Sequence, residues 1–191
     1  DIATAMNMIK AAIEIAQHDE VTLQEKATIY NESALIYQQL KIFDKAYEYA
    51  LAAKNNWLSS GDNQGVYYGL RNLAVAATDM GEYQKATQHL NELTTFSKSH
   101  PEFNDIPFYL SYHKAVLFRA QEKWSDAITF FQQTIDLQHL SSSKPFIQAA
   151  YEQLALMHFF QGDQKTSFDI LNASEEKFGA KVTIKKEVLP L

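Results

Sequence analysis

Cysteine is absent from the 191 residues of this chain. A chain without cysteine has no disulfide framework, no thiolate zinc site and no cysteine nucleophile. Proline and glycine are scarce, with 4 and 6 copies, and together with abundant alanine, glutamine, leucine and tyrosine this scarcity favours helices. No apolar run approaches the roughly 18 residues that a membrane-spanning helix needs, so we expect no membrane insertion.

Positive charge is also in short supply. Lys and Arg number 17 against 23 Asp and Glu, so the formal net charge is -6. Because nucleic-acid phosphates attract concentrated basic faces, we expect no nucleic-acid contact by this region. The hydrophobic fraction of 46% is too high for a disordered chain.

The start of the chain shows no targeting pattern. Asp1 leads directly into a helical pattern, without the basic and apolar segments of a signal peptide. We interpret the chain as a fragment of a longer protein or as a processed form. The cytoplasm is the favoured compartment and the periplasm the alternative, because a chain without cysteine is tolerated in both.

Small residues recur with a period of about 40, which indicates internal repeats. In four similar short segments the small residues lie at intervals of 40, 41 and 40, namely Ala46, Ala86, Ala127 and Ser167. Each has a partner 12 residues upstream, and the partners are Ala34, Ala74, Ala115 and Ala155. Two antiparallel helices approach closely only where side chains are small, so each pair predicts one helical hairpin.

Turn and cap residues support the hairpins. Gly81 and Gly162 follow the first helix of their hairpins, where a left-handed residue ends a helix. Residues suited to N-caps stand near the starts of second helices, namely Asp44, Ser125 and Asp163. Pro107 and Pro145 lie where helices are expected to begin. Bulky residues are expected to fill the space around the small ones, namely Tyr37, Tyr83, Phe118 and Trp124. One hairpin cannot bury its apolar face, so the hairpins must stack.

With these positions the chain resembles the tetratricopeptide repeat family, in its long-repeat form found in bacterial regulators. The resemblance implies an all-α fold, a right-handed α-α superhelix of about four hairpins plus one leading helix. It covers one repeat domain, 1–178, with repeats near 27–60, 67–98, 108–140 and 148–178. Residues 1–18 are similar to the second helix of a truncated preceding repeat. For the tail, 179–191, an extended segment and the start of a further helix remain equal alternatives.

Chemistry-bearing motifs are not evident. The sequence has no Gly-rich phosphate loop, no His-Glu-x-x-His and no Gly-x-Ser-x-Gly pattern. None of the 6 histidines has another at i+3 or i+4, the spacing of a helical metal site. We therefore expect no enzymatic activity, no cofactor and no metal site.

The resemblance also implies a concave groove lined by the first helix of each hairpin. The residues expected to bind a peptide there are Asn31, Tyr68, Arg71, Asn72, Tyr109, Tyr112, His113 and Arg119. Other positions on the same face include Gln38, Asp79 and Gln153. Asn would bind the peptide backbone, Arg a carboxylate and Tyr apolar side chains. The family's carboxylate clamp for chaperone tails is not reproduced, since only Asn72 agrees with it. Packing between the second and third repeats is an equal alternative for Tyr109 and Tyr112.

Three functional hypotheses follow. The first is a non-catalytic module that binds a protein or peptide partner. The second is a ligand- or peptide-sensing input domain of a larger bacterial signalling or transcription regulator, for example one attached to a diguanylate cyclase. The third is a homodimer formed through the ends of the array, where a truncated first helix would leave apolar surface uncovered.

Overall fold

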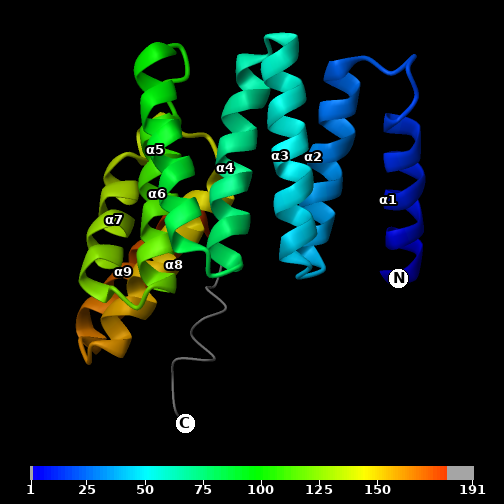
Figure 1. The fold of residues 1–191 in the computed structure, drawn as a ribbon. Coiled ribbons are helices and arrows are strands. Elements are labelled where there is room, and N and C mark those ends of the chain that lie inside the picture. Colours follow the sequence, from blue (N-terminus) through cyan, green and yellow to red (C-terminus); the bar gives the residue numbers. More distant parts are fainter. Residues whose placement is uncertain (1, 180–191) are drawn as a thin grey trace. The chain divides into compact units, whose positions relative to one another are not determined.

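The computed structural model describes residues 2–179, in which helices joined by turns and short loops make up the fold (Figure 1). Its helices are α1 (Ile2–Ala16), α2 (Leu23–Gln39), α3 (Phe43–Ser60), α4 (Asn63–Asp79), α5 (Tyr83–Ser99), α6 (Ile106–Ala120), α7 (Trp124–Asp136), the 3-10 turn η1 (Gln138–Leu140), α8 (Lys144–Phe160) and α9 (Gln164–Phe178). The all-α fold class is confirmed. Within residues 2–179, no helix combines the length and the hydropathy that a membrane span requires.

The chain divides into two compact units, an N-terminal unit (Asp1–Ser99) and a C-terminal unit (His100–Leu191). In the N-terminal unit α1 packs on α2, and two hairpins follow, α2–α3 and α4–α5. Successive helices run antiparallel there, and α2 also touches α4 (Figure 1). The C-terminal unit holds the hairpins α6–α7 and α8–α9, with α7 packed on α8.

The small residues that define the repeat are all buried. Each of the eight is at most 3% exposed, and they comprise Ala34, Ala46, Ala74, Ala86, Ala115, Ala127, Ala155 and Ser167. The 12-residue offset therefore identified the faces along which the two helices of each hairpin meet. Tyr37 fills the adjoining core as expected, but Trp124 does not, because it is 44% exposed at the first position of α7.

The four turns inside the hairpins share one conformation. A left-handed residue follows the first helix each time, and the four are Lys41, Gly81, Glu122 and Gly162. Two hydrogen bonds close each turn in the Schellman pattern, as when Ile42 N donates to Tyr37 O at 2.9 Å and Lys41 N to Gln38 O at 2.9 Å. The glycine turns were predicted, whereas Lys41 and Glu122 adopt a conformation that costs a residue with a Cβ about 1–2 kcal/mol.

Helix starts are where the sequence-based boundaries were least accurate. Asp44 and Ser125 lie inside the first turns of α3 and α7, and neither residue is the N-cap there. Asp163 does cap α9, accepting a hydrogen bond from Thr166 N at 3.1 Å. The first helix of every hairpin begins before the expected residue, and side-chain caps begin two of these helices, α2 and α4. For α2 the cap is a Thr22–Glu25 capping box.

Two glycines inside α4 let it lie directly against α3. A Cβ built on Gly65 would come within 2.2 Å of the Trp57 ring, and one on Gly69 within 2.8 Å of Lys54 Cβ. A helical glycine costs about 1 kcal/mol relative to alanine. The close approach explains why the sequence nevertheless keeps glycine at both positions.

A buried histidine joins α3 to α5. Tyr47 Oη lies 2.9 Å from His89 Nε2, and His89 Nδ1 is buried without a hydrogen bond, 3.6 Å from Glu92 Oε1. Glu92 also pairs with Lys54 Nζ at 3.4 Å, and Lys85 Nζ lies 5.8 Å above the Tyr47 ring. Burial lowers the pKa of His89, and Lys54 lowers it further, while Glu92 acts in the opposite direction.

The single repeat domain over 1–178 and its right-handed superhelix stay predictions, because the chain divides into two compact units. Gly179 ends α9 in a left-handed conformation. The expectation for the rest of the tail falls on residues 180–191 and lies outside the described part of the chain.

The turn strain gives a first prediction. Glu122→Gly should raise the free energy of unfolding by about 0.5–1 kcal/mol, because relief of the left-handed strain exceeds the added unfolded-state entropy of glycine. Gly81→Ala, at the equivalent turn, should lower it by about 1 kcal/mol. Urea unfolding of the purified variants measures both, and equal stability of Glu122→Gly and the parent chain would contradict the strain argument.

The buried histidine gives a second prediction. Because its pKa is lowered in the folded state, the unfolded chain binds more protons below pH about 6.5. The free energy of unfolding should therefore fall as the pH drops below that value, until the folded state is also protonated. His89→Gln should flatten this pH dependence in thermal unfolding, and His18→Gln, at an exposed position, should not. A slope that survives in His89→Gln would show that His89 is not its source.

Candidate binding surface

A row of polar side chains joins α2 to α4 in the N-terminal unit. Gln24 Nε2 donates to Asp62 Oδ2 at 3.0 Å, Asn72 Nδ2 to Asn31 Oδ1 at 2.7 Å, and Gln38 Nε2 to Asp79 Oδ2 at 3.2 Å. We call these six residues the polar seam. Asn31 and Asn72, both predicted to line the groove, are thus in direct contact.

The helical period explains the seam. On α2 its members are seven residues apart, which is close to two helical turns and keeps them on one side of the helix. On α4 the seam starts at the N-cap, Asp62, whose Oδ1 accepts a hydrogen bond from Gly65 N at 2.9 Å. The same carboxylate therefore begins α4 and anchors it to α2.

Tyr68 and Arg71 lie on α4, between the seam residues Asp62 and Asn72 in the sequence. Tyr68 is 41% exposed and accepts a hydrogen bond from Gln64 Nε2 at 3.2 Å. Arg71 Nη1 donates to Tyr67 Oη at 3.5 Å, and its Cζ lies 5.4 Å from the centre of the Tyr67 ring. Tyr67 is buried, so it holds the guanidinium at the surface while Tyr68 offers an aromatic face to solvent.

The aromatic site residues of the C-terminal unit are placed differently. Tyr109, Tyr112 and His113 surround the ring of Phe146 on α8, at centroid distances of 5.1, 4.9 and 6.1 Å. Tyr109 and His113 are buried, and burial raises the pKa of Tyr112. These three side chains therefore hold α6 against α8, and little of their surface is left for a ligand.

Arg119 lies on the same side of α6 and donates a hydrogen bond to Gln153 Oε1 on α8. The pair repeats the helix-to-helix polar contact of the seam with different residues. Arg71 and Arg119 are the two arginines of the whole sequence, and both occupy this side of a first helix.

The structure adds contacts that sequence reasoning missed. Gln24, Asp62 and Phe146 were not placed at the site, although Gln38, Asp79 and Gln153 were. The amides 24, 31 and 38 repeat every seven residues, and that spacing was the available signal for Gln24. No comparable pattern pointed to Phe146. The assignment of the eight candidate residues to ligand binding stays a prediction.

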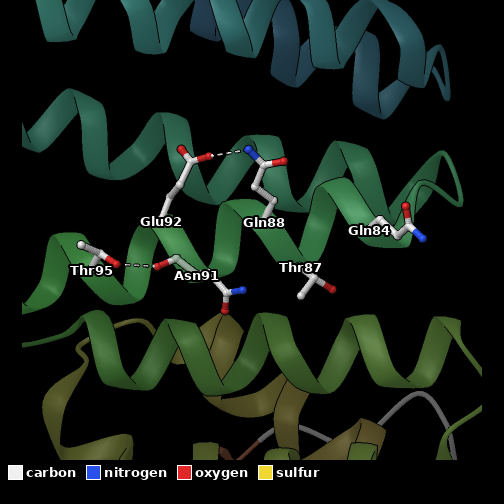
Figure 2. A pocket seen from close by; sticks show the side chains of 6 residues that line it. All are labelled: Gln84, Thr87, Gln88, Asn91, Glu92 and Thr95. Atoms are coloured by element: carbon white, nitrogen blue, oxygen red, sulfur yellow. Dashed lines mark hydrogen bonds between the residues drawn. The ribbon is translucent and has the colours of Figure 1, made fainter.

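Two shallow hollows also lie in the N-terminal unit. One of about 480 Å³ lies at the Gln38–Asp79 contact of the seam. Its lining is Leu35, Gln38, Gln39, Lys41, Phe43 and Asp79. Another of about 570 Å³ runs along one side of α5 (Figure 2), where the lining side chains are Gln84, Thr87, Gln88, Asn91, Glu92 and Thr95. The hydrogen bond from Gln88 Nε2 to Glu92 Oε1, at 3.3 Å, links two of them along the helix. Within residues 2–179 no group of three or more His, Asp or Glu is placed to hold a metal ion.

Comparison with known proteins supports the fold only. No protein-family model matches the sequence, and no curated protein matches it. Among solved structures it is similar to BtubC (BKLC) from P. vanneervenii, with a TM-score of 0.67 and 17% sequence identity. The match covers 91% of this chain and 72% of that one. An identity this low shows a shared helical fold and carries no function across.

The seam gives a third prediction. In a double-mutant cycle, Asn31→Ala and Asn72→Ala should each lower stability, with a coupling energy of about 0.5–1.5 kcal/mol for the part-buried amide pair. Thermal or urea unfolding of the two single variants and the double variant measures it. Additive losses would show that the two amides do not interact in solution.

Proposed function

We propose that the chain is a non-catalytic interaction module of the tetratricopeptide type, and that the polar seam and its neighbours Tyr68 and Arg71 bind a segment of a protein partner. The observation that carries the proposal is the direct Asn31–Asn72 contact, flanked by the two other seam contacts. It creates a band of amide and carboxylate groups along two adjacent helices, next to an exposed tyrosine and a guanidinium.

Such a band suits an extended peptide. Asn and Gln side chains carry both donors and acceptors, and these match the alternating N–H and C=O groups of an extended backbone. Arg71 would pair with a carboxylate of the partner, and Tyr68 would cover an apolar side chain. In a larger regulator, the second hypothesis from the sequence, the same surface would receive the signal.

Among residues 2–179, the titratable group nearest to a catalytic arrangement gives no support for an enzyme over an interaction module. Tyr47, His89 and Glu92 form a group of titratable side chains, but His89 is buried between α3 and α5, while the Glu92 side chain is 37% exposed. A general base must reach a substrate proton, which a buried imidazole between two helices does not.

A cross-linking experiment tests the proposal and supplies the fourth prediction. A photoreactive phenylalanine in place of Tyr68 should capture a partner segment from the native host. A synthetic peptide of that segment should then bind the purified chain, and Arg71→Ala or Tyr68→Ala should weaken binding by about tenfold each, as expected for contacts at an interface centre. Isothermal titration calorimetry measures the change.

Matched variants away from the seam are the controls. Lys85→Ala removes an exposed cation from α5, and Leu58→Ala removes an exposed apolar side chain from α3. Both should bind as the parent chain does. If Arg71→Ala and Tyr68→Ala keep the parent melting temperature and the parent affinity, the seam is not the binding surface.

A further inference from the structure

A third hollow, of about 770 Å³, lies within the N-terminal unit, where the end of α1 meets the start of α2. Its lining is Ile15, Glu20, Val21, Thr22, Gln24, Glu25, Thr28 and Ile29. The loop 17–22 and the first turns of α2 form its wall, and Ile15 comes from the last turn of α1. The volume is enough for one or two large side chains of a partner.

The hollow has apolar walls that continue onto exposed surface. Ile15, Val21 and Ile29 line it, and Ile15 remains 55% exposed. Met8 lies two turns before Ile15 on α1 and is 68% exposed. Ile9 follows Met8 and lies about 100° further round the helix, where it is buried and packs on α2. Among the described residues, α2 covers only part of the apolar surface of α1, and the exposed part ends in the hollow.

The rim carries negative charge. Between Lys10 and Lys26 the chain has four carboxylates and no Lys or Arg. Glu20 and Glu25 line the hollow itself. Glu25 Oε2 accepts hydrogen bonds from Thr22 N at 2.9 Å and Thr22 Oγ1 at 2.8 Å, and these bonds lower the pKa of its carboxyl. Glu25 is therefore fixed in place and ionised at neutral pH.

We infer that this hollow is a docking site for a protein segment in which a large aliphatic side chain is flanked by Lys or Arg. The aliphatic side chain enters between Ile15, Val21 and Ile29, and the cations pair with Glu20 and Glu25. Apolar walls alone would accept many occupants. The acidic rim selects a basic one, because unlike charges across an interface attract and like charges repel.

The same charges argue against a second copy of this chain as the occupant. Two α1–α2 hollows brought face to face would place four carboxylates of Glu20 and Glu25 beside one another, in a protein whose net charge is already -6. The lining of this hollow shares only Gln24 with the polar seam. Evidence against one site therefore does not count against the other.

The fifth prediction tests the site with a defined probe, a short synthetic peptide of alternating Leu and Lys. Added to the full chain with isotope-labelled methyl groups, it should shift the methyl signals of Ile15, Val21 and Ile29. Peptides of alternating Leu and Glu, or Ser and Lys, should not. Raising the salt from about 50 mM to about 500 mM should weaken binding, because the rim charges are screened.

Two variants and two matched controls decide the outcome. Ile15→Ser should weaken binding by about tenfold or more. Glu20→Gln should weaken it by about two- to fivefold. Leu58→Ser and Glu82→Gln, at exposed apolar and acidic positions elsewhere in the same unit, should leave it unchanged. Arg71→Ala should also bind the probe normally, which separates this site from the seam.

Three results would overturn the inference. One is parent-like binding by both Ile15→Ser and Glu20→Gln. Another is a set of shifted signals that omits the hollow. The third is a dimer, seen by light scattering, that Ile15→Ser dissolves, because the occupant would then be a second copy of the chain. Glu20 is exposed and outside any helix, so its variant remains informative even if Ile15→Ser disturbs folding.

Discussion

The rotation of each helix about its own axis is the constraint on which the rest of this structure depends. Small residues 12 positions apart are buried in every hairpin, from Ala34 and Ala46 to Ala155 and Ser167. Once those faces are turned inward, the opposite faces are determined by the 3.6-residue period. The left-handed turn that follows the first helix recurs at the same distance from these residues in all four hairpins. One packing rule thus sets both the core and the surface.

The candidate surfaces follow from that rotation. Asn31 precedes its buried alanine by three residues and Asn72 by two, so both lie beside the hairpin core and can meet between α2 and α4. In the C-terminal unit the equivalent region holds aromatic rings around Phe146. The repeats therefore share a backbone arrangement while differing in chemistry, with an amide-rich contact in one unit and an aromatic one in the other.

The periodic part of the fold could be predicted from the sequence, and the contacts between unlike residues could not. The alanine pattern predicted the hairpins well because the same spacing recurs in four repeats. Glycine just after a helix commonly marks the left-handed residue that ends it. Phe146 carried no such signal, because its role depends on three side chains supplied by another helix. Trp124 misled because its aromatic type suggested a core position, while its place at the start of α7 leaves it facing solvent. The Thr22–Glu25 cap was readable, and it would have corrected the start of α2.

The glycines at 65 and 69 have a consequence for how the N-terminal unit folds. They make α4 a poor helix by itself, and they let Trp57 and the stem of Lys54 lie flat on its backbone. Helicity in α4 therefore arises together with its docking on α3, rather than before it. In a linear array, where each repeat contacts only its neighbours, such a dependence raises the coupling between adjacent hairpins at the expense of their separate stabilities. The first two hairpins should consequently lose structure as one cooperative block, with no stable state in which only one of them is folded.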